Sequence, residues 1–134
     1  MEMRFTEQEI KAAQQLEELG LQWTPQAGHY VLDPTGFCKA PSPIQDRVYF
    51  ILNYPYFMKA AGGVDRFKKL MTWLPTWYDA RTILRELKVS DQEVADRIEQ
   101  SRAIQSGEER FELYQMIAKQ LSSSALSMPA VGQE

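Results

Sequence analysis

The segment from Arg47 to Leu52 narrows the possible folds more than any other part of this sequence. It reads Arg-Val-Tyr-Phe-Ile-Leu, an almost continuous run of β-branched and aromatic residues that favours a β-strand. Because its apolar residues are continuous rather than alternating, we expect both faces of this strand to be buried. The segment is therefore predicted to be the central strand of a small sheet.

Two shorter segments upstream can pair with this strand. His29 to Leu32 has strand-forming residues, and residues 33–36 read Asp-Pro-Thr-Gly, the order typical of a type I β-turn. The turn predicts that residues 37–39 return as a further strand. Because so small a sheet needs a packed helical layer, the sequence predicts an α+β fold. Its antiparallel sheet would have two or three strands, from about residues 21–52.

Helices are expected on both sides of the sheet segments, and they dominate after residue 53. Thr6 and Glu9 have the spacing of a capping box, and Gly20 can end the helix that they begin. Ser90 and Glu93 repeat the capping-box spacing. Residues 71–74 are compatible with a short extended segment. The expected helices cover residues 7–19, 53–61, 64–70, 76–88, 91–105 and 108–121.

The length of 134 residues is typical of one domain. Residues 1–121 are predicted to form a single globular α+β domain. Residues 122–134 begin with three serines and include Pro129 and Gly132, a composition typical of chain ends without fixed structure. We expect a C-terminal tail there that is flexible or held by a neighbouring molecule.

The chain has one cysteine, Cys38, and one histidine, His29, and these counts exclude several kinds of site. A lone cysteine cannot form an internal disulfide. In addition, the start of the sequence lacks a signal-peptide pattern, and no apolar run reaches the ~18 residues of a membrane span. A cytoplasmic protein without a membrane partner is expected. Histidine-rich and thiolate zinc sites are excluded, and no glycine-rich phosphate loop is present. The prediction is therefore no metal, no cofactor and no catalytic residue.

Two alternatives with chemistry remain. His29 and Cys38 can act as base and nucleophile if the turn at residues 33–36 pairs their segments. His29, Asp46 and Tyr49 can line a small-molecule site, or the site of a small enzyme, between the sheet and the helices. A small buried cysteine and a polar histidine at a strand start explain the same residues without chemistry.

The middle of the chain is both basic and aromatic. Residues 47–88 contain eight Lys and Arg against three acidic residues, although the whole chain has a net charge of -3. Nine aromatic residues lie between positions 49 and 78. Trp, Tyr and Arg are the residue types enriched at interface hot spots, although core packing also explains many aromatics. The candidate binding residues are Lys68, Lys69, Trp73, Trp77, Arg81 and Arg85.

These features favour a small, non-enzymatic protein-interaction or adaptor domain that uses a surface within residues 54–88. The expected partner is another protein or a second copy of the chain, because the helices at 91–105 and 108–121 each carry an apolar stripe. Trp77 and Arg81 are four residues apart, which permits a cation–π contact. A nucleic-acid partner is not expected, because a pI of about 5.3 contrasts with the strongly basic footprint of such domains.

Overall fold

The structure, a computed structural model, describes residues 4–127, with side chains as far as Ser123. Within these residues it has seven helices and a three-stranded antiparallel sheet, which confirms the predicted α+β class. None of the described helices is both long enough and apolar enough to cross a membrane. In chain order, the elements are α1 (Glu7–Glu18), β1 (Tyr30–Leu32), β2 (Val48–Phe50), α2 (Tyr54–Ala61), α3 (Val64–Leu70), β3 (Thr72–Leu74), α4 (Trp77–Glu86), α5 (Asp91–Ser101), α6 (Ala103–Ser106) and α7 (Glu109–Ser127).

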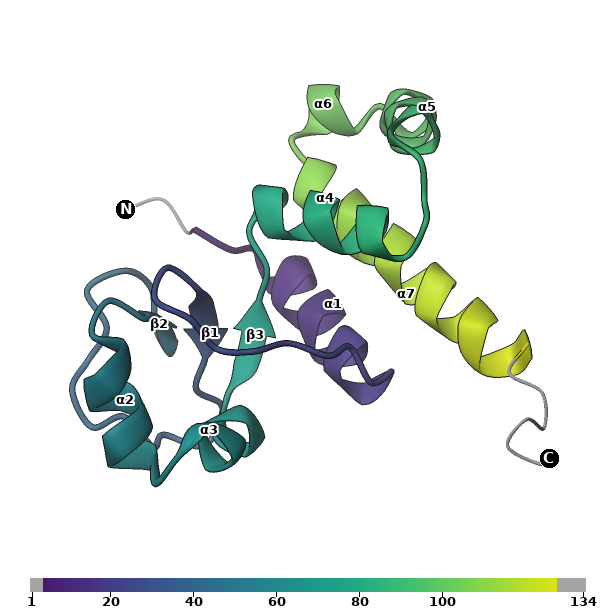
Figure 1. Ribbon diagram of the computed structural model, residues 1–134. Helices are drawn as coiled ribbons and strands as arrows, with labels where there is room; N and C mark the ends of the chain where they lie inside the picture. Colours follow the sequence, from purple (N-terminus) through teal and green to yellow (C-terminus); the bar gives the residue numbers. More distant parts are fainter. Residues whose placement is uncertain (1–3, 128–134) are drawn as a thin grey trace, which may run out of the picture.

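The sheet lies between two helical layers (Figure 1). One face packs against α1, α4 and α7 and contributes Leu32, Val48 and Leu74 to the larger of two apolar cores. The other face contributes Val31 to a smaller core, which it shares with α2 and α3. In β1, Val31 and Leu32 belong to different cores because successive side chains point to opposite faces of a sheet. The two cores thus share only the thin sheet between them.

The capping signals in the sequence are confirmed. The Thr6 hydroxyl accepts the Glu9 N–H at 3.1 Å, while the Glu9 carboxylate accepts the Thr6 N–H at 2.8 Å. Ser90 and Glu93 form the same reciprocal pair at the start of α5. Each pair satisfies two N–H groups that a helix start would otherwise leave without partners. These starts are therefore fixed by residues only three positions apart.

The predicted strand order is wrong. The observed order is β2-β1-β3, so β1 is the central strand and β2, from the Arg47–Leu52 segment, lies at an edge. The third strand is β3, which lies outside the expected 21–52 region, and residues 37–39 do not join the sheet. The physical reason is that the buried Asp33 carboxylate accepts the N–H groups of Phe37 and Cys38, at 3.0 and 2.7 Å. Those amides are therefore not available to pair with β1.

The last helix is longer than predicted, because α7 continues to Ser127 rather than ending at Leu121. The expected tail at residues 122–134 therefore begins inside a helix, and its remainder lies outside the described residues. The apolar face of α7 includes Tyr114 and Ile117, and both are fully buried against α1 and α4. This face is consequently not available to a second copy of the chain.

Candidate functional site

The six candidate binding residues do not form one surface. Lys68 and Lys69 lie on α3, which packs beside α2 on one side of the sheet. Trp77, Arg81 and Arg85 lie on α4, on the other side of the sheet (Figure 1). These residues are close together along the chain. In the fold, however, β3 lies between α3 and α4 and carries the chain from one helical layer to the other.

Trp73 belongs to a packed aromatic cluster at the sheet rather than to an exposed surface. Its ring stacks on Trp23 with centroids 5.4 Å apart, and the His29 ring lies 4.9 Å from it. Burial in this cluster lowers the pKa of His29, and the charge of Asp79 partly opposes that shift. Within the described residues, His29 Nδ1 and the Trp73 indole N–H have no hydrogen-bond partner. The cluster therefore favours the neutral form of His29.

The arginines of α4 form a paired arrangement with the start of α5. The Arg81 guanidinium lies 5.2 Å from the centroid of the Trp77 ring, in the geometry expected from their spacing. Both Arg81 and Arg85 form salt bridges with Asp91, at 3.0 and 3.1 Å. Hydrogen bonds from Arg85 and Arg81 lower the pKa of Asp91, so it remains ionised at neutral pH. No local sequence pattern identifies Asp91 as the partner of these arginines, because the contact depends on how α4 and α5 pack.

A groove of about 580 Å³ lies beside this arrangement. Its apolar residues come from α5, α6 and α7, while α4 contributes an indole and a guanidinium. Two large apolar side chains along it are strongly exposed: Trp77 at 49% and Ile104 at 66%. The groove is lined by Trp77, Arg81, Asp91, Val94, Ala95, Ile98, Glu99, Ile104, Gln105, Glu109 and Leu113.

The charge of this groove differs from the predicted basic surface. Arg81 and Asp91 neutralise each other across their salt bridge. The other charged residues in the lining are Glu99 and Glu109, and neither forms a salt bridge with a described residue. The groove is therefore apolar with a net negative charge. Its acidic residues, Glu99 and Glu109, belong to α5 and α7 and lie outside the predicted surface at residues 54–88.

A second pocket, of about 500 Å³, lies between the loop at residues 37–43 and α2. We call this loop the pocket loop. Tyr49 lines the pocket, but His29 and Asp46 do not, so the structure does not bring the proposed trio together in it. The pocket is lined by Phe37, Cys38, Lys39, Ala40, Pro41, Pro43, Tyr49, Tyr56, Phe57 and Ala60.

Cys38 has the environment of an unreactive thiol. Burial, followed by the neighbouring Asp33 charge and a hydrogen bond to it, raises the pKa of Cys38 to about 11. A thiol nucleophile requires the opposite shift, because the thiolate is the reactive form. No hydrogen bond joins Cys38 to His29 in the described part of the chain, where His29 packs against the Trp23 and Trp73 rings. This geometry does not favour the cysteine–histidine alternative.

We expect Cys38 to react with iodoacetamide at a rate that rises about tenfold per pH unit between pH 8 and 10. The reason is that the thiolate fraction keeps rising until the pH reaches the raised pKa of about 11. The matched control is the same chain in urea, whose rate should level off near the ordinary cysteine pKa of about 8.5. Mass spectrometry measures both rates, since the chain has one cysteine. A folded-state plateau near pH 8.5 would contradict the assigned environment.

Comparisons with known proteins give no match: no protein-family model, no curated protein and no solved structure matches this chain. Among the described residues, no three His, Cys, Asp or Glu side chains lie close enough together to hold a metal ion. Within residues 4–127, the groove beside α4 and the pocket beside α2 each combine volume with a mostly apolar lining.

Proposed function

We propose that this chain is a non-enzymatic protein-interaction domain whose binding site is the groove between α4, α5, α6 and α7. The observation that carries the proposal is the groove itself, with its apolar lining and the exposed Trp77 and Ile104 along it. Its volume lies within the ~300–1,000 Å³ typical of ligand sites. Exposed tryptophan beside an apolar depression is the arrangement typical of an interface hot spot.

The occupant that fits best is an amphipathic helix of a partner protein. An amphipathic helix places apolar side chains at i, i+4 and i+7 into such a groove. Glu99 and Glu109 favour Lys or Arg beside those apolar residues, because neither glutamate is neutralised by a salt bridge within the described chain. Of the predicted 54–88 surface, α4 alone contributes to this groove, through Trp77 and Arg81.

The Trp77 side chain is held in place before any partner binds. Arg81 contacts its ring, and Arg81 is in turn fixed by the 3.0 Å salt bridge to Asp91. The Arg81 side chain is only 19% exposed, so the guanidinium has little freedom to move away. Ordering an anchor in advance reduces the entropy lost on binding. The arginines thus support the proposed site by positioning the indole rather than by supplying free positive charge.

The test is a selection of helix-forming 16-residue peptides from a random displayed library against the full chain. We expect selected peptides to share apolar residues at helical spacing flanked by Lys or Arg. In fluorescence-anisotropy titrations, Trp77→Ala or Ile104→Glu should weaken their binding by about 30-fold, the effect of a hot spot worth ~2 kcal/mol. Tyr78→Ala is the matched control, because Tyr78 is 71% exposed on α4 but does not line the groove.

Thermal melts should show that all three variants fold, since each replaced side chain is substantially exposed. Selection of acidic or non-helical peptides, or equal affinity of the selected peptides for Ile104→Glu and the unmodified chain, would overturn the proposal.

A further inference from the structure

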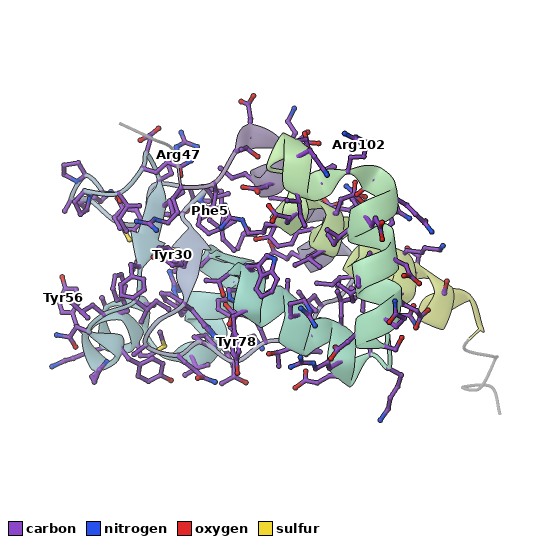
Figure 2. All side chains as sticks on the ribbon, turned by 90° about the horizontal axis from the view of Figure 1, so that it is seen from above. Phe5, Tyr30, Arg47, Tyr56, Tyr78 and Arg102 are labelled. Atoms are coloured by element: carbon purple, nitrogen blue, oxygen red, sulfur yellow. The ribbon has the colours of Figure 1, made fainter. Side chains whose placement is uncertain are left out.

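We propose that the pocket between the pocket loop and α2 binds a small molecule with an apolar, aromatic body and a single anionic group. This site is separate from the proposed protein-binding groove. Tyr56, which lines the pocket, and Arg102, at the junction of α5 and α6, lie toward opposite ends of the molecule (Figure 2). The two sites therefore lie apart in the structure.

The pocket loop is fixed by hydrogen bonds at both ends, although it has no regular secondary structure. At its start, the buried Asp33 carboxylate accepts two backbone N–H groups. Near its middle, the Tyr49 hydroxyl donates to the Ala40 carbonyl at 2.5 Å. Near its end, the Ser42 hydroxyl donates to the Val48 carbonyl. The wall of the pocket is thus formed before a ligand arrives, which is typical of small-molecule sites.

The interior of the pocket favours an aromatic body. Aromatic side chains face it from the loop and from α2, namely Phe37, Tyr56 and Phe57, and two prolines add flat apolar surface. The Cys38 thiol is uncharged at neutral pH because its pKa is raised to about 11. Aromatic rings pack favourably edge-to-face or offset against one another. A volume of about 500 Å³ is suited to a small molecule.

The charge at the pocket argues for an anionic group on the ligand. Among the described residues that line it, Lys39 alone is charged, and no carboxylate lines it. Lys39 is exposed and forms no salt bridge with any described residue. An anion near the opening gains attraction from the Lys39 ammonium group, whereas a cation is repelled.

The test uses two fluorescent probes with the same aromatic body. 1-Anilinonaphthalene-8-sulfonate carries one anionic group, and N-phenyl-1-naphthylamine lacks it. We expect the sulfonate to bind saturably with one molecule per chain. Ala60→Trp should weaken both probes at least tenfold by filling the pocket, and the substitution is tolerated because Ala60 is exposed. Lys39→Gln should weaken the sulfonate about threefold, as for an exposed charge pair, and leave the neutral probe unchanged.

A second measurement places the probe without any substitution. Because the chain has one cysteine and Cys38 lines this pocket, saturating sulfonate should slow its alkylation at pH 9 at least threefold. The matched control is Ile104→Glu, which alters the distant groove and should leave probe affinity unchanged. The proposal is overturned if neither probe binds saturably, if Ala60→Trp has no effect, if Lys39→Gln changes both probes equally, or if Cys38 is not protected.

Discussion

Replacing Arg110 with leucine is expected to lower the free energy of unfolding by about 3 kcal/mol, because it leaves a buried carboxylate without its charge partner. Arg110 donates to Glu9 at 2.8 Å, and the Glu9 side chain is only 5% exposed. The same guanidinium donates to the Arg4 carbonyl and lies 4.1 Å from the centroid of the Phe5 ring. One side chain thus joins the start of α7 to the start of α1. Urea denaturation followed by circular dichroism measures the change.

The matched control for this prediction is Arg97→Leu. Arg97 forms a salt bridge of similar length to Glu112, at 3.0 Å, but its side chain is 46% exposed. Because the Arg97 side chain remains in contact with solvent, loss of this pair should change stability by less than about 1 kcal/mol. Adding Glu9→Gln to Arg110→Leu should restore part of the loss, because glutamine is neutral and still offers an oxygen to the Thr6 N–H. Equal effects of the two arginine replacements would contradict a role for burial.

Phe67→Ala is expected to destabilise the protein by about 3 to 5 kcal/mol, the usual effect of removing a buried phenylalanine side chain. Phe67 is fully buried in the smaller core, and its ring meets Phe57 edge-on at 6.0 Å. It lies on α3, a helix of seven residues whose N-cap makes no side-chain hydrogen bond. Packing through Phe67 therefore holds the α2 and α3 layer against the sheet.

The control is Phe67→Leu, which retains most of the buried volume and should cost less than about 1.5 kcal/mol. Urea unfolding should remain a single transition with an unchanged slope in both variants, since the sheet is shared by the two cores. A markedly lower slope for Phe67→Ala would show that the α2 and α3 layer unfolds by itself, against a single cooperative domain.

The candidate site could be predicted only in part. The sequence identified Trp77, Arg81 and their contact, because two residues four apart on a helix face each other whatever the rest of the fold does. The sequence also predicted that Lys68, Lys69 and Trp73 share this surface. In the structure they lie elsewhere. The reason is that β3 carries the chain from one helical layer to the other between α3 and α4. Exposure also varies within this basic and aromatic region: Trp77 is 49% exposed, whereas Phe67 is fully buried. Composition does not distinguish these two environments.

Neither the groove nor the pocket could be predicted from the sequence. The groove takes residues from four helices, α4 to α7, and includes Glu99 and Glu109, which belong to the acidic part of the chain. The pocket beside α2 depends on the carboxylate of Asp33, a residue that the sequence predicts only as the first position of a hairpin turn. Both are products of contacts between segments that no local pattern connects.

The sequence by itself determined where the capped helices begin. Thr6, Thr76 and Ser90 each bond to a backbone N–H three residues ahead, so the information is local. Tertiary structure decided the order of the strands. Tyr30 pairs with both Phe50 and Leu74. The predicted local hairpin does not form, because the Asp33 carboxylate accepts the N–H groups of Phe37 and Cys38. Pairing across such separations depends on which faces the helices can bury, and that property belongs to the whole chain.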